Sequence, residues 1–450
     1  MTSVYARAAL LEAGWAEGVR ITLDGERICA IDSGVAPGSG DERHEIVVPG
    51  LDNLHSHAFQ RAMAGLAEVR GPAHDNFWSW RKVMYDFGLN YDPPQIEAVA
   101  AQLYMEMLEA GFTRVGEFHY LHHDRNGAPY DNLAEMAERI AAASQAAGIS
   151  LTLLPVFYAH STFGGAAPGE GQRRFINSRD DFARLMERCQ TLVAGLPGGR
   201  FGVAPHSLRA VTPSELAEIV PLAKGGPVHI HVAEQVLEVE DCLAWSGARP
   251  VQWLLDNAPV DASWTFIHAT HMSETETAGM ARRGVVAGLC PITEANLGDG
   301  IFPASLFLES GGNFGIGSDS NILISAAQEL RQLEYAQRLA TRSRNVIAHP
   351  GRSTGDRLFD EALRGGARSI GGGGHLAAGR DADFVALDVS AVPYLPVEAV
   401  LDQWIFGGGV GVDAVWVRGQ MRVRNGRHVD RERIFTHFAA SMHALRQRIS

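Results

Sequence analysis

Two histidines, His55 and His57, stand two residues apart at the end of an apolar run that is typical of a β-strand. Side chains two apart on a strand share one face, so both imidazoles can point at the same spot. The spacing is a weak indication by itself, because 18 histidines in 450 residues give roughly one such pair by chance. The pair alone therefore leaves open two ordinary histidines as the alternative to a metal site.

Histidines and carboxylates also stand at or near the ends of later strand-like segments. They are His206, His231, Glu234, His268 and Asp319. In a parallel barrel these ends meet at one rim, which is where barrel enzymes keep their active sites. Three neutral imidazoles and one carboxylate suit Zn²⁺ or Fe²⁺ with one position left open for water. This agreement makes scattered, strand-capping histidines the weaker interpretation.

A metal ion in such a site can lower the pKa of water to about 7 and so supply hydroxide at neutral pH. Glu234 lies three residues beyond His231, so it can approach the reacting centre without binding the metal. Asp319 can bind the metal through one oxygen and accept the water proton on the other. His268 can hydrogen-bond the hydroxide or the developing tetrahedral centre. We therefore expect Glu234, His268 and Asp319 to be the catalytic residues.

The lysine content bears on the number of metal ions. Barrel hydrolases with two bridged metal ions commonly need a carbamylated lysine at a strand end. This chain has only two lysines, Lys82 and Lys224, and both lie outside the predicted strand ends. The sequence therefore favours one divalent ion, which we expect to be Zn²⁺, with Fe²⁺ as the alternative.

Eight strand-like segments alternate with segments of helical periodicity, among them 95–110, 132–147 and 326–340. This alternation predicts an α/β fold with a parallel sheet, and eight strands can close into a (β/α)₈ TIM-type barrel. A doubly wound open sheet is the alternative. The expected strands are 45–54, 113–120, 150–157, 200–207, 227–234, 264–271, 284–292 and 313–319.

The two chain ends have a different pattern. Residues 19–32 predict a hairpin, and 382–388 and 413–424 are strand-like, with a turn at Asn425-Gly426. Neither end could bury a core alone, so we expect both to pair into one small β-sandwich, which the chain re-enters through the glycines 371–374. The predicted regions are 1–48 (small β domain, first part), 49–370 (metal-dependent barrel), 371–430 (small β domain, second part) and 431–450 (C-terminal helix).

Composition excludes several classes of partner. The formal net charge of −13 gives no basis for general binding to nucleic acids or anionic membranes. No apolar run approaches the ~20 residues that span a bilayer, and no signal-peptide pattern stands at the N-terminus. The four cysteines are at least 48 residues apart, which excludes a CxxC pair. We expect a soluble, cytoplasmic protein that binds a small molecule, and neither nucleic acid nor a membrane.

Several of these segments together resemble the amidohydrolase superfamily, in its deaminase branch. The resemblance lies in residues 49–57, in the HxxE at 231–234, in His268 and in 317–319, while 379–388 resembles that superfamily's return to its small β domain. The resemblance implies an enzyme, and by analogy with this branch a homodimer. It also implies that His55, His57, His231 and Asp319 bind zinc, while Glu234, His268 and Asp319 transfer protons.

Within that branch, segments 57–61, 77–81, 117–120 and 204–209 are similar to the formimidoylglutamate deiminases, a family of histidine-degradation enzymes. This implies hydrolysis of N-formimidoyl-L-glutamate to N-formyl-L-glutamate and ammonia. The substrate carries two carboxylates and a cationic amidine, and guanidinium groups bind carboxylates bidentately. The resemblance places Gln60, Arg81, Tyr120, His206 and Arg209 in the substrate pocket; the alternative for both arginines is a surface position.

The orientation of several neighbouring side chains stays open. His119 and Tyr120 cannot both point inward on a regular strand, and the resemblance selects Tyr120. His229 shares parity with His231, but we expect it in a lower layer of the core. We expect the histidines 122–123 to be solvated loop residues.

Three other functions remain as alternatives. A related aminohydrolase could act on a nucleobase, a nucleoside or another amidine, with Trp78–Trp80 as a stacking platform rather than a packed helix or loop anchor. Imidazolonepropionase, from the same superfamily and pathway, would open a ring without releasing ammonia. A catalytically silent metal-binding scaffold would not require Glu234 and His268.

Overall fold

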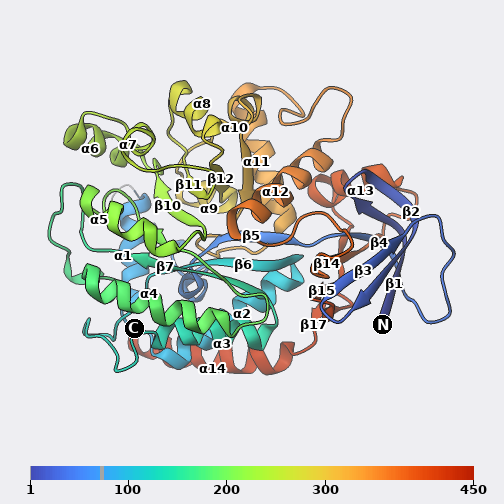
Figure 1. Cartoon of the computed structure of the whole chain (residues 1–450), viewed down its shortest axis with the longest axis horizontal. Helices are drawn as coiled ribbons and strands as arrows, with labels where there is room; N and C mark the ends of the chain where they lie inside the picture. Colours follow the sequence, from blue (N-terminus) through green and yellow to red (C-terminus); the bar gives the residue numbers. More distant parts are fainter. Residues whose placement is uncertain (1, 71–74, 450) are drawn as a thin grey trace.

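The computed structural model describes residues 2–70 and 75–449, and it has a larger α/β part and a smaller β part (Figure 1). In the larger part, every recorded pairing between the strands is parallel. The α/β fold with alternating strands and helices is therefore confirmed. The strands of this part are β5 (Leu51–Ser56), β6 (Phe112–His119), β7 (Ser150–Phe157), β8 (Arg200–Phe201), β9 (Ala204–Pro205), β10 (Val228–Val232), β11 (Trp264–His268), β12 (Val286–Leu289) and β13 (Asn313–Ile316).

These strands form two hydrogen-bonded sheets, β5-β6-β7-β8 with β9 beside β7, and β10-β11-β12-β13. Isolated bridges link their edges: Ser56–Asp319 on one side, and Val203–Val228 and Ser207–His231 on the other. Among the described residues, no continuous ladder closes the two sheets into one barrel. All strand ends that carry predicted site residues nevertheless face the same region.

The expected strand 45–54 is wrong in one respect, because it is two strands that belong to different sheets. Residues up to Pro49 pair with β1 and β14 in the small part, and β5 begins at Leu51 in the large part. Gly50 joins them where a side chain would collide with Thr113. The apolar run is continuous in sequence, so nothing in its periodicity marks this change of sheet.

Helices surround the parallel strands, and the expected helices at 95–110, 132–147, 326–340 and 431–448 are confirmed within a few residues. No helix of the described segments combines the length and apolar character needed to cross a bilayer. The helices are α1 (Phe77–Gly88), α2 (Pro93–Glu109), α3 (Glu135–Ala147), α4 (Arg179–Ala194), α5 (Pro213–Ile219), α6 (Val236–Ser246), α7 (Pro250–Asn257), α8 (Glu274–Arg282), α9 (Pro291–Leu297), α10 (Ala304–Glu309), α11 (Ala326–Thr341), α12 (Thr354–Ile370), α13 (Val400–Asp402) and α14 (Arg431–Ile449), with short turns η1 (Ala58–Met63), η2 (Glu170–Gln172), η3 (Val220–Ala223), η4 (Val397–Ala399) and η5 (Gln403–Gly407).

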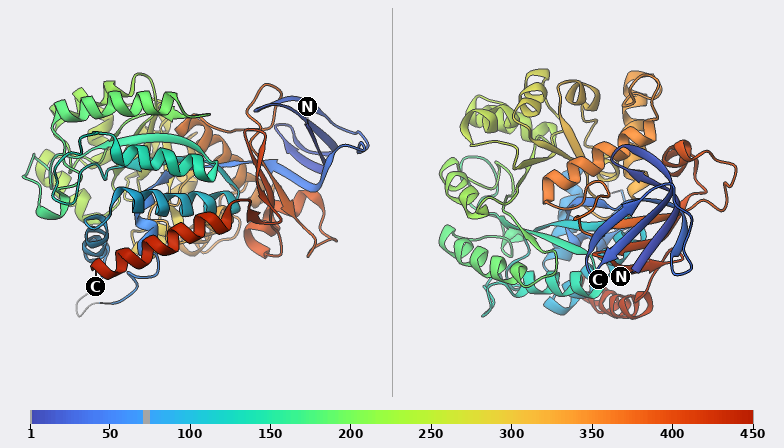
Figure 2. Two further views of the ribbon diagram at one scale, coloured as in Figure 1. Left: turned by 90° about the horizontal axis from the view of Figure 1, so that it is seen from below. Right: turned by 45° about the vertical axis from the view of Figure 1, so that its right-hand side comes forward.

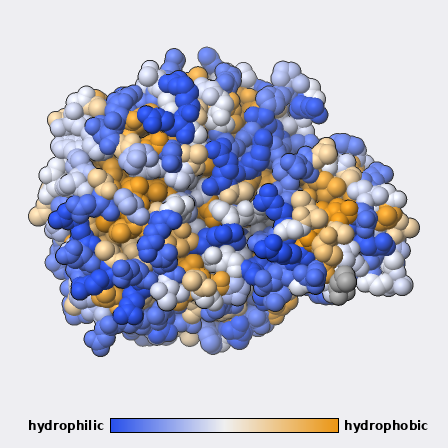
Figure 3. Space-filling view, in the orientation of Figure 1, coloured by the Kyte–Doolittle hydropathy of each residue, from blue (hydrophilic) through white to orange (hydrophobic). Residues whose placement is uncertain are grey.

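The smaller part is one eight-stranded sheet of order β17-β16-β15-β14-β4-β1-β2-β3. Strands from both chain ends pair in it, as predicted: the C-terminal strands β17-β16-β15-β14 form one half, the N-terminal strands β4-β1-β2-β3 form the other, and β14 pairs with β4 between them (Figure 2). Asn425 and Gly426 form the left-handed turn between β16 and β17. Apolar side chains gather on part of its surface (Figure 3). The strands are β1 (Thr2–Leu11), β2 (Gly14–Asp24), β3 (Arg27–Asp32), β4 (Glu42–Pro49), β14 (Phe384–Asp388), β15 (Gly411–Val417), β16 (Gln420–Arg424) and β17 (Arg427–His428).

Helix α14 returns from the small sheet to the large part and lies along α2 (Figure 2). Arg448 near its end donates to the side chain of Gln95 (3.1 Å) and forms an ion pair with Asp92 (2.7 Å). These contacts bind the last turns of the chain to the start of α2.

Candidate metal centre and active site

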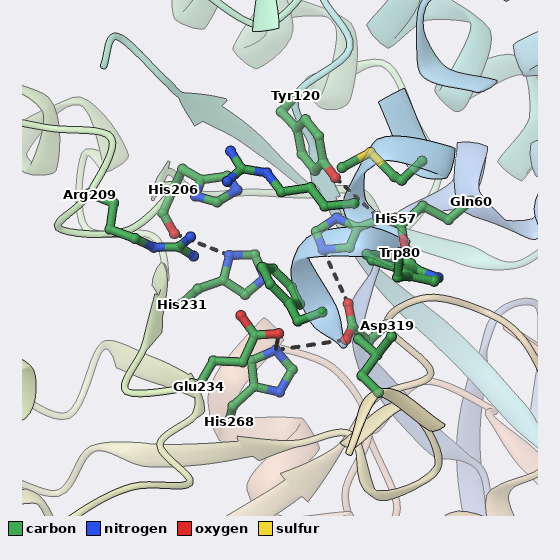
Figure 4. Close-up of a pocket in the computed structure, with 14 residues that line it drawn as sticks. His57, Gln60, Trp80, Tyr120, His206, Arg209, His231, Glu234, His268 and Asp319 are labelled. Carbon is green, nitrogen blue, oxygen red and sulfur yellow. Dashed lines mark hydrogen bonds and ion pairs between the residues drawn. The ribbon is translucent and has the colours of Figure 1, made fainter. Parts of the chain in front are cut away.

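A pocket lies at the C-terminal ends of the parallel strands, and all but one of the predicted site residues line it (Figure 4). The exception is His55, which lies beneath the others and is fully buried. The lining residues are His57, Gln60, Phe77, Trp80, Arg81, Met84, Tyr120, His206, Arg209, His231, Glu234, His268, Leu297 and Asp319.

Three imidazoles and one carboxylate converge at the base of this pocket. Oδ1 of Asp319 lies 3.2 Å from Nε2 of His57 and 3.4 Å from Nε2 of His55. Nε2 of His231 lies 3.1 Å from Nε2 of His55. One potential ligand atom from each of the four residues falls within 4.8 Å of all the others. The four residues that the resemblance implied as metal ligands are thus brought together from β5, β10 and the end of β13.

The protonation states of these imidazole rings are those that metal binding requires. Nδ1 of His57 donates to the carbonyl of Phe118 (3.0 Å) and Nδ1 of His231 to that of His206 (3.1 Å), which leaves Nε2 of each as a lone pair. Burial lowers the pKa of His55 to about 3 and holds that of His231 well below its usual value, so both rings are neutral. Converging lone pairs and a carboxylate repel one another unless a cation lies between them. The residues therefore fit a divalent metal ion.

The backbone at these strand ends is held in unusual conformations. Asp319, His268 and Ala233 have positive φ angles of 45°, 67° and 52°, which cost energy for residues other than glycine. The main chain of Asp319 also bonds both metal-site strand residues: its N–H donates to His55 (3.0 Å) and its carbonyl accepts from His57 (3.1 Å). These bonds fix the carboxylate against the two imidazoles.

His268 lies between three carboxylates. Its Nε2 is 3.7 Å from Oε1 of Glu234 and 3.7 Å from Oδ2 of Asp319, and its Nδ1 is 3.3 Å from Oε1 of Glu294. Burial opposes a charge on the ring, but the carboxylates outweigh burial and raise the pKa of His268 to about 10. Burial raises the pKa of Glu234. Burial also acts to raise that of Asp319, but the facing imidazoles of His55 and His57 together with the charge of His268 outweigh it and lower that pKa. A proton donor and a proton acceptor therefore stand on either side of one imidazole.

The turn that presents Glu234 is held by a residue that the sequence did not indicate. The buried carboxylate of Glu238 accepts the backbone N–H groups of Ala233 (3.2 Å) and Glu234 (3.1 Å). These two bonds stabilise the left-handed conformation of Ala233. Glu238 is thus a positioning residue for Glu234.

Two arginines, Arg81 and Arg209, line the same pocket as His268. Nη2 of Arg81, on α1, donates to the hydroxyl of Tyr158 (2.9 Å), which also accepts from Gln172 (2.7 Å). The guanidinium of Arg209 lies over the rings of Phe77 and Trp78, at 6.0 and 5.6 Å from the ring centroids. Nε of Arg209 is buried and has no hydrogen-bond partner among the described residues.

Trp78 and Trp80 lie on a packed helix, α1, and Trp80 also lines the pocket. Gln60 donates to the hydroxyl of Tyr120 (3.0 Å), and both residues line the pocket, as does His206. Tyr120 can face inward because β6 ends at His119, so strand alternation no longer applies. His119 is buried away from the pocket lining.

His229 lies in the core, as expected, with Nε2 at 3.2 Å from the carbonyl of Ser369. The expectation that 122–123 are solvated is wrong: both histidines are buried, and they bond the carbonyls of Val156 (2.9 Å) and Ile176 (2.7 Å). The loop after β6 folds under residues 174–176, a distant contact that local polarity does not reveal.

Comparisons with known proteins agree with this geometry. The family described as "Amidohydrolase family" matches residues 46–422, and "Formimidoylglutamate deiminase HutF, N-terminal domain" matches residues 1–45. The formimidoylglutamate deiminase of Pseudomonas aeruginosa is 50% identical over 441 residues, which cover 96% of this chain and 97% of that protein. A 5-methylthioadenosine/S-adenosylhomocysteine deaminase of Natronomonas pharaonis is 28% identical, over 82% of this chain and 79% of that protein.

Solved structures are also similar to this chain. The crystal structure of an amidohydrolase from Brucella melitensis is 59% identical, with a TM-score of 0.97 over 99% of this chain and 100% of that chain. An adenosine deaminase from Xanthomonas campestris with bound zinc shares the fold at 23% identity, with a TM-score of 0.82 over 100% of this chain and 98% of that chain. The chain therefore belongs to the amidohydrolase family and, within it, to the group that contains the formimidoylglutamate deiminase of Pseudomonas aeruginosa.

Proposed function

We propose that this protein hydrolyses N-formimidoyl-L-glutamate to N-formyl-L-glutamate and ammonia, as a step of histidine degradation. The observation that carries the proposal is the buried guanidinium of Arg209, whose Nε has no hydrogen-bond partner among the described residues, in the pocket that has the His-His-His-Asp group at its base. A buried guanidinium calls for a carboxylate partner, and this substrate has two. The named relative at 50% identity, over nearly the whole of both chains, supports the same substrate.

In the proposed site, His55, His57, His231 and Asp319 hold one divalent metal ion, Zn²⁺ or in its place Fe²⁺, since both accept these ligands. When bound, the ion acts as a Lewis acid and makes water more acidic. Oδ1 of Asp319 faces His55 and His57, whereas Oδ2 faces His268. Asp319 is therefore suited to bind through one oxygen and accept the water proton on the other.

The remaining roles follow from the placement of the protonated groups. Water adds to the amidine carbon, Glu234 delivers a proton to the leaving nitrogen, and the carbon–nitrogen bond breaks to release ammonia. His268, charged between its carboxylates, donates a hydrogen bond to the developing tetrahedral centre. Arg81 and Arg209 bind the two carboxylates of the substrate. Gln60, Tyr120 and His206 line the rest of the pocket and position the substrate.

We also propose that the two parallel sheets act as one (β/α)₈ TIM-type barrel, with β8 and β9 as two halves of one strand. The bridges Ser56–Asp319 and Ser207–His231 support this closure. The curled eight-stranded sheet would be a β-sandwich, which is supported by the cluster of Ile21, Phe384 and Trp416 with their buried neighbours. The proposal also includes a homodimer and a cytoplasmic location. It divides the chain into the regions 1–48, 49–370, 371–430 and 431–450.

The test is a comparison of substrates on the metal-loaded protein. We expect ammonia release from N-formimidoyl-L-glutamate and none from a panel of purines, pyrimidines and nucleosides, with no opening of the imidazolonepropionate ring. Chelation should abolish the activity, and Zn²⁺ or Fe²⁺ should restore it. Ammonia release from a base, with none from the amidine, would overturn the proposal. Equal activity before and after complete metal removal would do the same.

A further inference from the structure

A second group of metal-binding side chains shares Asp319 with the first. His268, Cys290 and Asp319 each place one potential ligand atom within 4.8 Å of the other two, and all three side chains are buried. Cys290 follows β12 directly and does not line the pocket, whereas His268 and Asp319 do. The group is separate from the three histidines of the first site.

Two potential ligand atoms of this group, Nε2 of His268 and Oδ2 of Asp319, face each other. Nδ1 of His268 is taken up by Glu294, which leaves Nε2 toward Asp319. The 3.7 Å between that Nε2 and Oδ2 of Asp319 is slightly longer than the about 3.3–3.5 Å between a nitrogen and an oxygen ligand of one tetrahedral zinc ion, so a small closing movement would bring both atoms onto one ion. Oδ1 of Asp319 meanwhile faces His55 and His57. A bridging carboxylate of this kind joins metal ions about 3.5–4 Å apart.

The surroundings favour a thiophilic cation. No hydrogen bond to the sulfur of Cys290 is recorded within 2–70 and 75–449, so the thiol has no competing partner there. Oε1 of Glu234 lies 3.7 Å from Nε2 of His268 and can supply a fourth ligand. One sulfur, one imidazole nitrogen and carboxylate oxygens select Zn²⁺ or Cd²⁺ over Mg²⁺, Ca²⁺ or Mn²⁺.

We propose that His268, Cys290 and Asp319 form a second, inhibitory site for Zn²⁺ or Cd²⁺, adjacent to the first metal site. Binding exchanges the thiol proton of Cys290 and the Nε2 proton of His268 for bonds to the metal, and it releases both protons to solvent. The bound ion occupies Nε2 of His268 and Oδ2 of Asp319. The inhibition rests on the proposed function, in which Oδ2 of Asp319 accepts the water proton and His268 donates a hydrogen bond to the tetrahedral centre. The binding of the ion does not rest on it.

Cadmium binding to the zinc-loaded protein tests the site directly. The parent for all measurements is Cys29→Ser, because Cys29 is exposed and would bind cadmium by itself. After dialysis against excess Cd²⁺, we expect two equivalents of total metal per chain and an ultraviolet sulfur-to-cadmium charge-transfer band. The first site has no sulfur ligand, so exchange of cadmium for zinc there gives no band. Mg²⁺ should produce neither effect.

The variants Cys290→Ser and Cys290→Ala in this parent should hold one equivalent and show no band. Their inhibition by Cd²⁺, relative to each variant's own uninhibited rate, should need at least about tenfold more metal. Cys189→Ala is the matched control, since Cys189 is equally buried but lies on α4. One equivalent in the parent, or an unchanged band in both Cys290 variants, would overturn the proposal. Metal content and the band decide this even if the protein does not deiminate formimidoylglutamate.

Discussion

Oε1 of Glu294 lies 3.3 Å from Nδ1 of His268 and at the same time accepts the backbone N–H of Cys290 (2.9 Å). The N–H bond fixes the carboxylate, and the carboxylate fixes both the rotation and the charge of the imidazole. His268 can then present Nε2–H to the pocket. Glu294 does not line the pocket, so in the proposed mechanism it is a positioning residue that acts through His268.

Replacement Glu294→Gln should therefore lower kcat by about 10–100-fold with little change in KM, because it affects His268 and not substrate binding. One fewer carboxylate should also lower the pKa of His268, which is raised to about 10 in the intact protein. Since the charged ring is lost as pH rises through that pKa, the alkaline limb of the pH–rate profile should move to lower pH. Steady-state kinetics across pH 6–10 measure both effects.

The exposed Glu309 on α10 provides the matched control, and Glu309→Gln should leave the profile unchanged. A Glu294→Gln variant with a normal alkaline limb would contradict the coupling to His268. A purely structural role for Glu294 would lower activity equally at every pH.

Glu234 gives the sharpest test of proton delivery. Burial raises its pKa, so the side chain can hold the proton that the leaving nitrogen needs. Glu234→Gln should lower kcat by about 10²–10⁴-fold while metal content stays at one equivalent. Metal analysis alongside ammonia release checks both. Glu240→Gln, at an exposed position on helix α6, which follows Glu234, is the control. Full turnover in Glu234→Gln would remove the residue from the mechanism and reopen the scaffold alternative.

Much of the site could be predicted from the sequence because polar residues interrupt apolar strands at one end. His231, His268 and Asp319 each stand at or just after such an end, and parallel strands bring those ends together. The alternation of strands and helices likewise predicted the α/β fold. These features depend on local pattern, which a single sequence contains.

Other features depend on contacts between distant segments. Glu294 reaches His268 from α9, and Tyr158 reaches Arg81 from the end of β7, yet neither stands in a distinctive motif. The burial of His122 was mispredicted for the same reason, since the carbonyl of Val156 lies 34 residues further on. Tertiary packing decided these positions, and local polarity carried no information about them.

We expect Arg209 to strengthen substrate binding and to lower the stability of the folded protein. Its guanidinium is buried and makes no ion pair with any described residue, which is a costly arrangement until a substrate carboxylate arrives. Arg209→Met keeps much of the side-chain volume and removes the charge. We expect kcat/KM for formimidoylglutamate to fall by about 10²–10³-fold and the free energy of unfolding to rise by about 1 kcal/mol. Steady-state kinetics and urea unfolding measure the two effects.

Arg179→Met is the control for Arg209. Arg179 is half exposed and forms a surface ion pair with Glu218, so its loss should cost less than about 1 kcal/mol and leave kinetics unchanged. If Arg209→Met bound substrate normally, the substrate carboxylates would have to meet other residues. A loss of stability in Arg209→Met would show that its aromatic contacts with Phe77 and Trp78 outweigh the cost of its buried charge.

The last prediction concerns the junction between the two parts of the molecule. Asp52 is buried beside Arg114, and neither of its oxygens has a hydrogen-bond partner among the described residues. Gly372 and Gly373 pass so close that a side chain at either position would press against Asp52. Burial raises the pKa of Asp52 from 3.8 to about 7, with Arg114 opposing and Asp383 reinforcing the shift.

The sign of the pH dependence follows from proton binding. Between pH 3.8 and about 7, folded Asp52 keeps a proton that the unfolded chain has released, so stability falls as pH rises through this window. Asp52→Asn has the same shape and no charge. We expect its free energy of unfolding, relative to wild type, to increase by on the order of 2 kcal/mol between pH 5 and pH 8. Urea unfolding of holoprotein at pH 5, 6, 7 and 8 measures this difference. Asp32→Asn, at an exposed position on β3, should follow the wild type at every pH. A constant difference between Asp52→Asn and wild type over this range would mean that Asp52 is already ionised at pH 5, with Arg114 as its effective counter-ion.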